Sequence, residues 1–302
     1  MLASAGMELR GVLAALTTPF SDGEVCLDAL YSNLQRYECL ALGGYLLLGS
    51  TGEALLLEEQ ERCDLLERAR EAIPASKPLI VGVTAESTRG AVRQAARLAD
   101  LGADAALVST PHYFRAQMTS AALAHHFQAI ADGSPVPVLL YNVPKFTGLS
   151  IPVDVVCGAS RHENVVGLKD SSGDLEYLGR VLAGSRPGFR VLCGDAPVLR
   201  DALAAGAAGA ILAAATFMPE PLIDIAAGGR PPSDDLREVV AAAKRVTGRF
   251  GVSGIKAAVD LRGLQGGSVR SPLVPLEAQA RREIERLIVR LVDRGILPRR
   301  EL

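Results

Sequence analysis

A single lysine ends one of the apolar segments of the chain, "VVGLKD" at residues 165–170, in a sequence with only five lysines among its 32 basic residues. Burial in apolar surroundings favours the neutral amine of a lysine, which is nucleophilic at neutral pH. The chemistry that needs such an amine is formation of a Schiff base with a ketone. The structural alternative is a salt bridge between Lys169 and a nearby acid, Asp170 or Asp195.

A tyrosine, Tyr141, stands near the end of the preceding apolar segment, "VPVLLYN" at residues 136–142. Adjacent parallel strands lie about 4.8 Å apart, so a phenol here is expected to reach a ketone carbon bonded to Lys169. It would shuttle the protons that carbinolamine formation and dehydration require. The alternative is a tyrosine whose ring packs in the core while its hydroxyl bonds a carbonyl.

The segment "GSTGE", residues 49–53, follows another apolar run and places two hydroxyl residues between glycines. Backbone N–H groups in such a turn form a concave nest that suits a carboxylate, and Ser50 and Thr51 add hydroxyl donors. Many turns of this composition connect two elements and bind no ligand. Together with a nucleophilic amine, however, a carboxylate-binding turn favours a 2-keto acid as substrate.

The candidate residues lie at the ends of apolar runs, and these runs alternate regularly along the chain with segments of helical pattern. Helical spacing of apolar residues occurs between the runs, for example at residues 28–43 and 88–102, and the second pattern ends at Gly102, a fitting residue to follow a helix. Near-continuous apolar runs are typical of parallel strands buried on both faces. They lie at residues 13–19, 44–50, 79–84, 105–110, 136–142, 165–170, 190–195 and 209–215.

Eight such units predict an α/β fold, a (β/α)8 barrel, whose active site lies at the carboxyl ends of the strands. A doubly wound open sheet is the alternative, but it normally carries a GxGxxG-type loop, which the sequence lacks. The pattern becomes purely helical after Pro219. We therefore predict a catalytic barrel over residues 1–226 and a C-terminal helical extension, residues 227–302, packed on it.

Composition excludes several classes of function. Of the 302 residues, 49% are apolar and only 4% aromatic, which predicts an aliphatic core, and a net charge of −2 with mixed signs argues against nucleic acid as a partner. The sequence has no uninterrupted apolar stretch of about 18 residues, and residues 1–20 lack the pattern of a signal peptide. Five scattered cysteines predict reduced, mostly buried thiols in a cytoplasmic protein. The four histidines lack metal-ligand spacing, and no metal is expected.

Three motifs, "GSTGE", "YNVPKFTG" at residues 141–148 and "VVGLKDSSGD" at residues 165–174, resemble the dihydrodipicolinate synthase / N-acetylneuraminate lyase family in order and spacing. The resemblance extends from residue 11 to residue 276. It implies a class I, pyruvate-handling lyase or aldolase on a (β/α)8 barrel. It also implies that no cofactor is required, and it suggests a homo-oligomer, a dimer of dimers.

The resemblance also implies roles for single residues. Lys169 matches the Schiff-base lysine and Tyr141 the general acid/base. Ser50 and Thr51 match the pair that binds the pyruvate carboxylate, with Ser50 also in a proton relay. The remaining matches are Tyr113, a tyrosine that usually enters a neighbouring subunit's site, Gly194, the glycine of a "GD" turn near the site, and Ile211, a residue lining the pyruvate pocket. For Tyr113 the alternative is a rim tyrosine that packs locally.

The second substrate depends on Phe146, which stands where dihydrodipicolinate synthases typically carry an arginine for the aldehyde's carboxylate. Lys145 precedes it and, in an extended segment, is expected to point the other way. Residues 118–154 and "KDSSGD" look closer to the 4-hydroxy-2-oxoglutarate aldolase branch, although that branch usually has "YSVP" and "GSNGE". We therefore predict an aldolase that cleaves or forms a 4-hydroxy-2-keto acid such as 4-hydroxy-2-oxoglutarate.

Three alternatives stay open at this point. The first is 4-hydroxy-tetrahydrodipicolinate (dihydrodipicolinate) synthase itself, which joins pyruvate to an aldehyde. The second is a sugar-acid dehydratase, which would also use the imine. The third is a non-catalytic barrel that binds a keto acid, against which the presence of both Lys169 and Tyr141 speaks.

Overall fold

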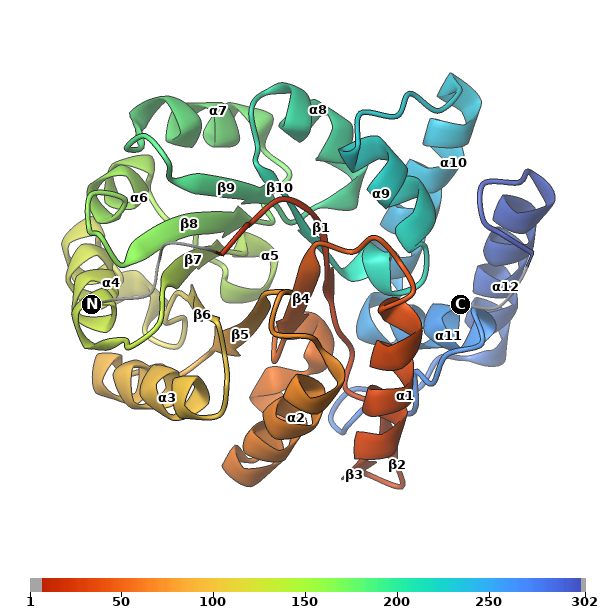
Figure 1. Cartoon of the computed structure of the whole chain (residues 1–302), viewed down its shortest axis with the longest axis horizontal. Coiled ribbons are helices and arrows are strands. Elements are labelled where there is room, and N and C mark those ends of the chain that lie inside the picture. The colour runs from red at the N-terminus through yellow and green to blue at the C-terminus, as the bar shows by residue number, and fades with distance from the viewer. Residues whose placement is uncertain (1–6, 300–302) are drawn as a thin grey trace. The chain divides into compact units, whose positions relative to one another are not determined.

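The computed structural model describes residues 7–299 of the chain. Its main strands close into a barrel in the order β1-β10-β9-β8-β7-β6-β5-β4 (Figure 1). All eight expected strands are present, so the predicted barrel is confirmed. They are β1 (Gly11–Ala15), β4 (Gly44–Leu47), β5 (Leu79–Val83), β6 (Ala105–Ser109), β7 (Val138–Asn142), β8 (Val165–Asp170), β9 (Arg190–Cys193) and β10 (Gly209–Leu212).

Residues 78–211, with the N-terminal stretch to Arg10, form one of two compact units. Its strands β5 to β9 pair in parallel, and nearly every residue in them is buried. Aliphatic side chains fill this core, as the low aromatic content predicts. Its helices are α3 (Thr88–Asp100), α4 (Ser120–Gly133), α5 (Pro144–Thr147), α6 (Val153–Ala159), α7 (Leu175–Gly184) and α8 (Leu199–Ala204).

Local signals in the sequence set the ends of these helices. The Ser87 hydroxyl caps α3 by accepting a hydrogen bond from the Gly90 N–H, and the Asp174 carboxylate caps α7. Gly102, expected to follow α3, has a φ of 97°, a conformation that side chains with a Cβ disfavour. The residue types at these positions therefore favour the observed starts of α3 and α7 and the observed end of α3.

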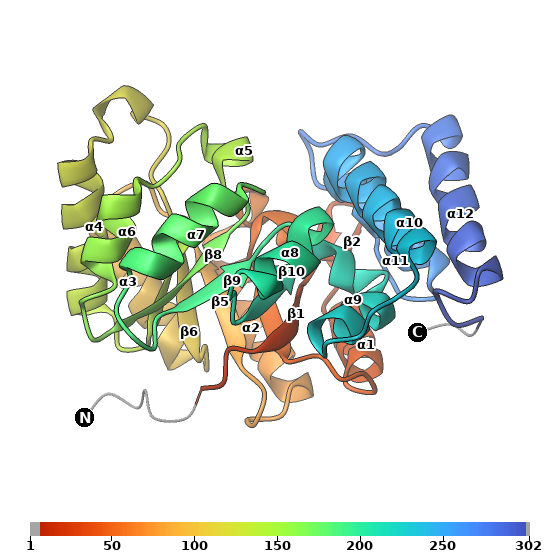
Figure 2. The same cartoon turned by 90° about the horizontal axis from the view of Figure 1, so that it is seen from above.

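Residues 11–77 and 212–302 form the second unit. A short antiparallel hairpin of β2 (Phe20–Ser21) and β3 (Glu24–Val25) follows β1, and the sequence patterns did not predict it. Figure 2 shows the C-terminal helices α10, α11 and α12 side by side. The helices of this unit are α1 (Leu27–Tyr37), α2 (Glu59–Ala72), α9 (Pro219–Ala226), α10 (Ser233–Ala243), α11 (Gly251–Leu261) and α12 (Ala278–Asp293).

The predicted helical character of the tail agrees with the structure, since the described residues after Pro219 contain helices and no strand. Residues 244–249 form a π-helical segment between α10 and α11. The boundary at residues 226 and 227 stays a prediction, because the tail groups with residues 11–77 in one compact unit.

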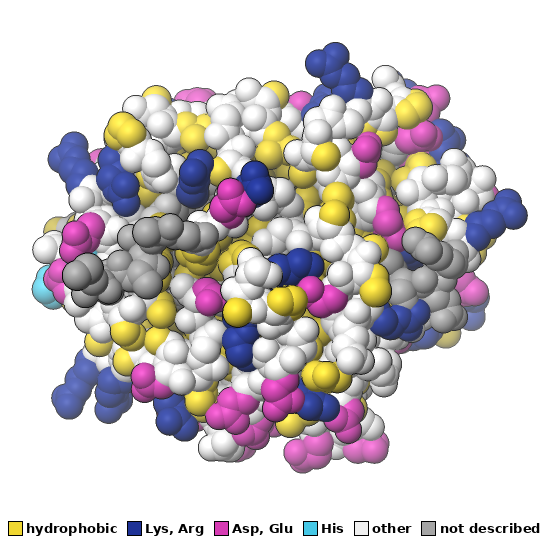
Figure 3. Space-filling view, viewed as in Figure 1, with side chains coloured by type: hydrophobic (Ala, Val, Ile, Leu, Met, Phe, Trp, Pro, Cys, Tyr) yellow, Lys and Arg dark blue, Asp and Glu magenta, His cyan; other side chains and the backbone are white. Residues whose placement is uncertain are grey.

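The surface and the cysteines bear on the functional classes. On the face shown in Figure 3, basic and acidic side chains are interspersed. Between residues 7 and 299, no helix is long and apolar enough to cross a membrane; residues 1–6 of the stretch considered for a signal peptide lie outside the described residues. All five cysteines are free, but only Cys63 and Cys193 are buried, so the expectation of mostly buried thiols is wrong.

Candidate active site

Lys169 and Tyr141 lie directly opposite each other on neighbouring strands. β7 pairs with β8 in a register that sets Tyr141 against Lys169. Both side chains are buried, with 4% and 7% of their surface exposed, and the Lys169 Nζ lies 4.5 Å from the centroid of the Tyr141 ring. The amine therefore lies beside the phenol ring, as the spacing of the two segments predicted.

Asp170, one candidate for a salt bridge with Lys169, is engaged elsewhere. Successive side chains of a strand point to opposite faces, so Asp170 is directed away from the lysine. Its Oδ1 accepts hydrogen bonds from Asn142 Nδ2 at 2.7 Å and from the Ser172 N–H at 3.2 Å, and its Oδ2 accepts one from the Ser172 hydroxyl at 2.8 Å. Burial raises the pKa of this carboxyl group, and these hydrogen bonds partly oppose that rise.

Asn142 follows Tyr141 on β7 and joins the ends of β7 and β8. In addition to its bond to Asp170, the Asn142 Oδ1 accepts a hydrogen bond from the Ile151 N–H at 3.0 Å. The Asn142 backbone carbonyl accepts another from the Ser171 N–H at 2.9 Å. The buried amide is thus satisfied on both sides and holds Tyr141 and Lys169 in register.

Gly194 follows β9 and packs tightly against the end of β8. A Cβ at this position would stand 2.1 Å from the Ser171 Oγ and 2.9 Å from the Asp170 carbonyl oxygen. The Gly194 N–H donates to that same carbonyl at 2.6 Å. Close approach of the two backbones therefore requires glycine here.

Cys193 ends β9, and Ile211 lies on the neighbouring strand β10. Burial raises the pKa of the Cys193 thiol to about 12, so the thiol stays neutral and does not compete with the Lys169 amine as a nucleophile. Ile211 lies on β10, is fully buried, and follows Ala210, which pairs with Cys193. Its aliphatic side chain is therefore part of the buried core, and its predicted place in the pyruvate pocket stays a prediction.

Tyr113 lies in the loop between β6 and α4, and 80% of its surface is exposed. Its ring meets the exposed ring of Phe114 edge to face, with centroids 5.1 Å apart. The N–H groups of His112 and Tyr113 donate to the Glu86 carboxylate, which holds the loop in place. The role of Tyr113 across an interface stays a prediction.

Phe146 and Lys145 lie on α5, where the sequence was expected to be extended. In the structure this segment is helical, so the expectation that Lys145 points away from Phe146 is wrong. The Lys145 Nζ lies 5.6 Å from the centroid of the Phe146 ring, and 59% of the Phe146 surface is exposed. The Lys145 ammonium therefore lies near the Phe146 ring, at the position where dihydrodipicolinate synthases typically carry an arginine.

Ser50 and Thr51, in the second unit, lie on a single turn of 3₁₀-helix, Ser50–Gly52, after β4. Leu48 and Glu53, which flank the "GSTG" stretch, both have a φ of 56°, in the left-handed region that residues with a Cβ seldom adopt. Such strain persists only where surrounding contacts enforce it, and it is frequent at functional sites.

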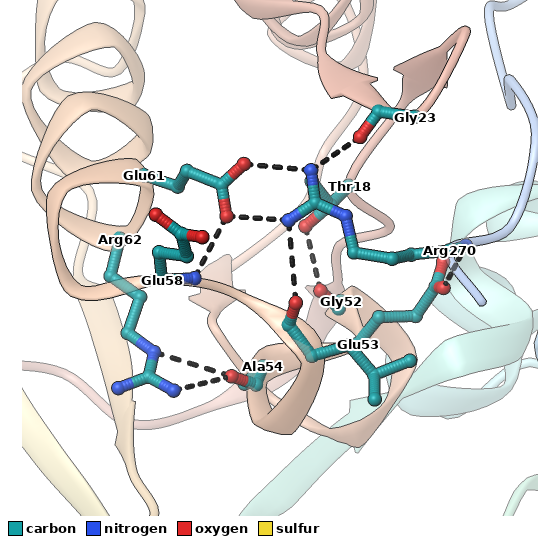
Figure 4. A network of polar contacts seen from close by, with 10 residues as sticks. Thr18, Gly23, Gly52, Glu53, Ala54, Glu58, Glu61, Arg62 and Arg270 are labelled. Atoms are coloured by element: carbon teal, nitrogen blue, oxygen red, sulfur yellow. Dashed lines mark hydrogen bonds and ion pairs between the residues drawn. The ribbon is translucent and has the colours of Figure 1, made fainter. Parts of the chain in front are cut away.

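A polar network surrounds this turn (Figure 4). The Thr18 hydroxyl donates to the Gly52 carbonyl at 2.7 Å, and the Arg62 guanidinium donates to the Ala54 carbonyl at 3.0 and 3.2 Å. Arg270 binds the Glu61 carboxylate through both terminal nitrogens, at 2.5 and 2.7 Å. The network holds the turn and its hydroxyls in a defined position.

The sequence patterns assigned no role to three further residues of these two clusters: Asn142, Glu53 and Lys256. Asn142 was visible only as part of the motif that carries Tyr141. Glu53 and Lys256 form a buried ion pair at 2.5 Å. A lysine within the otherwise apolar stretch "GVSGIKAAV" was a signal that could have pointed to it, because an isolated buried ammonium is costly.

Known proteins resemble the chain over nearly its whole length. The dihydrodipicolinate synthetase family matches residues 8–291. A 4-hydroxy-tetrahydrodipicolinate synthase from Xanthomonas axonopodis pv. citri is 34% identical, with 98% of this chain and 99% of the relative covered.

Solved structures agree with that assignment. Dihydrodipicolinate synthase from Thermotoga maritima matches with a TM-score of 0.87 at 28% identity, covering 96% of this chain and 100% of that chain. A prophage protein of the dihydrodipicolinic acid synthase family from E. coli K12, in complex with pyruvate, matches with a TM-score of 0.85 at 25% identity, covering 94% of this chain and 98% of its own. The chain therefore belongs to the dihydrodipicolinate synthetase family of pyruvate-dependent lyases that act through a lysine Schiff base.

Proposed function

We propose that Lys169 forms the imine with pyruvate and that the enzyme makes or breaks a carbon–carbon bond at the pyruvate methyl carbon. The observation that carries this assignment is the buried Lys169 amine facing the Tyr141 ring at 4.5 Å in the register of two adjacent strands. In the neutral state the amine attacks the ketone carbon, and the resulting carbinolamine loses water to give the imine.

The Tyr141 phenol carries the protons of these steps. It donates one to the carbinolamine oxygen, which leaves as water, and the phenolate takes one back in the reverse direction. The phenolate then takes a proton from the methyl group of the imine, which gives an enamine whose terminal carbon attacks an aldehyde. Ser50 and Thr51 are assigned to the pyruvate carboxylate, with Ser50 also relaying protons, because their hydroxyls lie on a turn whose conformation is enforced by its neighbours.

The first candidate for the second substrate is aspartate semialdehyde, as in 4-hydroxy-tetrahydrodipicolinate synthases. The name of the 34% identical relative and the proximity of the Lys145 ammonium to Phe146 support it. The second candidate is 4-hydroxy-2-oxoglutarate, cleaved to pyruvate and glyoxylate, and Phe146 favours it because a phenyl ring offers no charge-assisted bond to a carboxylate. The comparisons do not single out that branch of the family.

Neither metal nor organic cofactor is required in this proposal, because the imine itself accepts the electron pair. We expect activity to survive exhaustive chelation. Loss of activity with EDTA that zinc or magnesium restores would contradict this part of the proposal.

The assembly proposed is a homo-oligomer, a dimer of dimers, in which Tyr113 of one copy completes the proton relay of another. Its support is the 80% exposed Tyr113 ring beside the exposed Phe114. An aromatic pair left in solvent on a loop suits burial against a second copy. A cytoplasmic location also stays a prediction.

Trapping with borohydride tests the imine. Incubation with pyruvate and borohydride is expected to add a reduced pyruvate adduct to the peptide that contains Lys169, and Lys169→Arg is expected to abolish both adduct and turnover, since a guanidinium stays protonated. Lys145→Met is the matched control and should keep the adduct. An adduct on Lys145, or none in active enzyme, would overturn the assignment.

The specificity constants for the two reactions decide the second substrate. Condensation of pyruvate with aspartate semialdehyde and cleavage of 4-hydroxy-2-oxoglutarate are measured on the same preparation. Efficient condensation with negligible cleavage supports the first candidate, and the reverse ratio supports the second.

A further inference from the structure

Glu53, the last residue of the "GSTGE" segment, closes the turn that carries Ser50 and Thr51. Its N–H donates to the Ser50 carbonyl at 3.2 Å, and its backbone adopts the left-handed conformation, with a φ of 56°. The side chain is almost completely buried, with 4% exposed. Because this conformation is disfavoured for a residue with a Cβ, contacts of the side chain must hold it.

Two groups from the C-terminal part of the chain supply those contacts. The Lys256 Nζ lies 2.5 Å from the Glu53 Oε1, and the Arg270 backbone N–H donates to Oε2 at 2.8 Å. Figure 4 shows the Glu53 side chain reaching away from the turn, toward Arg270. Both carboxylate oxygens are therefore engaged, and the carboxylate cannot turn without losing a charged partner.

Lys256 is built into α11 and is itself held on several sides. Only 1% of its surface is exposed, its Nζ donates to the Ser268 carbonyl at 2.5 Å, and it lies 4.4 Å from the centroid of the Phe20 ring. Burial lowers the pKa of this ammonium, and the charge of Glu53 opposes the shift. Removing one member of such a pair leaves the other buried without its counter-charge.

We propose that Lys256 is a positioning residue for the reaction, which acts through Glu53 to hold the hydroxyls of Ser50 and Thr51 where they bind the substrate carboxylate. This inference rests on the proposed function of those two hydroxyls. It assigns the second buried lysine a task distinct from that of Lys169, because its amine is occupied by a carboxylate, a carbonyl and an aromatic ring. It also gives α11 a part in substrate binding.

Steady-state kinetics of Lys256→Met test the inference. Methionine keeps the length and the apolar stem of lysine but removes the charge, so the turn loses its anchor. We expect the KM for pyruvate to rise about 10- to 100-fold, the range in which a displacement of about 1 Å acts. Because Ser50 also relays protons in the proposed function, kcat should fall too, but at saturating pyruvate Lys169 should still be trapped by borohydride.

Arg262→Met is the matched control. Arg262 lies at the end of the same helix, is buried almost as completely as Lys256, and pairs with Glu220 at 2.7 Å, yet it makes no contact with Glu53 in the described part of the chain. We expect it to lower the melting temperature while leaving the KM for pyruvate within about twofold of wild type. If Lys256 had only a structural role, Lys256→Met would give the same result as Arg262→Met, a lower melting temperature with a nearly unchanged KM for pyruvate.

The double variant Glu53→Gln with Lys256→Met removes both charges and serves where the single variant does not fold. Its KM for pyruvate should be raised, but less than the product of the two single effects, since neither charge is left unpaired. A folded variant, single or double, with the pyruvate KM of wild type overturns the inference. If wild-type enzyme forms no trapped imine, the proposed function itself fails. If wild-type enzyme is trapped but the variants keep the wild-type KM, only the inference about Lys256 fails.

Discussion

Two of the buried tyrosines, Tyr141 and Tyr177, differ in what surrounds their phenols. The Tyr177 hydroxyl donates to the Ile151 carbonyl at 2.8 Å, and burial raises its pKa far above the ordinary value. Tyr141 instead has its ring against an amine, 4.5 Å from Lys169. The proposed proton exchange with a substrate bonded to Lys169 therefore belongs to Tyr141 and not to Tyr177.

Tyr141→Phe is expected to lower kcat by about 10²- to 10⁴-fold, the range for loss of a general acid/base, while the ring keeps its packing. Tyr177→Phe is the control. It should cost about 1 kcal/mol of unfolding free energy through its lost hydrogen bond and keep kcat. Near-normal kcat for Tyr141→Phe would favour the structural alternative for this tyrosine.

His126 offers a residue-scale test of pH dependence. It lies buried on α4, its Nδ1 is 2.9 Å from the Thr88 hydroxyl, and burial lowers its pKa to about 4. A histidine in the unfolded chain binds a proton below about pH 6.5. The contribution of His126 to the free energy of unfolding is therefore fully present above that pH and is lost as the pH falls toward 4.

We expect His126→Gln to flatten the fall in unfolding free energy between pH 6.5 and 4, by on the order of 1–3 kcal/mol. Wild-type protein supplies the reference slope. Denaturant titrations at a series of pH values measure both. Equal slopes in wild type and His126→Gln would show that another group causes the acid sensitivity.

At the scale of elements, α5 places the Lys145 ammonium beside the Phe146 ring. Its four residues follow Asn142 and Val143, and Gly148, with a φ of 66°, ends it. A Cβ at Gly148 would stand 2.3 Å from the Arg115 guanidinium, so glycine also leaves room for that side chain. The helix brings Lys145 and Phe146 together, which an extended strand would separate.

Phe146→Arg is expected to raise kcat/KM for aspartate semialdehyde about 10- to 100-fold, because each charge-assisted bond contributes about 1.5–3 kcal/mol before the cost of ordering the new side chain. Lys145→Met should lower the same constant in wild type if the ammonium already binds the carboxylate. Unchanged constants in both variants would mean that this carboxylate is bound elsewhere.

At the scale of the whole molecule, the exposed rings of Tyr113 and Phe114 bear on assembly. If Tyr113 acts in another copy, Tyr113→Phe removes a proton relay without removing the aromatic contact. We expect kcat to fall about 10- to 1,000-fold while light scattering reports an unchanged oligomer. A near-normal rate would favour the alternative of a tyrosine that packs locally.

The sequence by itself determined the barrel, because each buried parallel strand is a near-continuous apolar run and each intervening helix has apolar residues three or four positions apart. It also singled out Lys169 and Tyr141 as candidate reactive residues, because each is a polar side chain at the end of an apolar run. It did not reveal the two-residue strands β2 and β3, which are too short to leave a pattern, and α5 was misjudged as extended.

Only the tertiary structure decided how those residues are held. The register of β7 and β8 sets Tyr141 against Lys169, and a shift of one residue would turn one of them to the opposite face. The pairing of Glu53 with Lys256 joins segments far apart in the chain. Local periodicity reports which face of an element is buried, but it carries no information about which distant side chain meets a buried charge, since that depends on long-range packing.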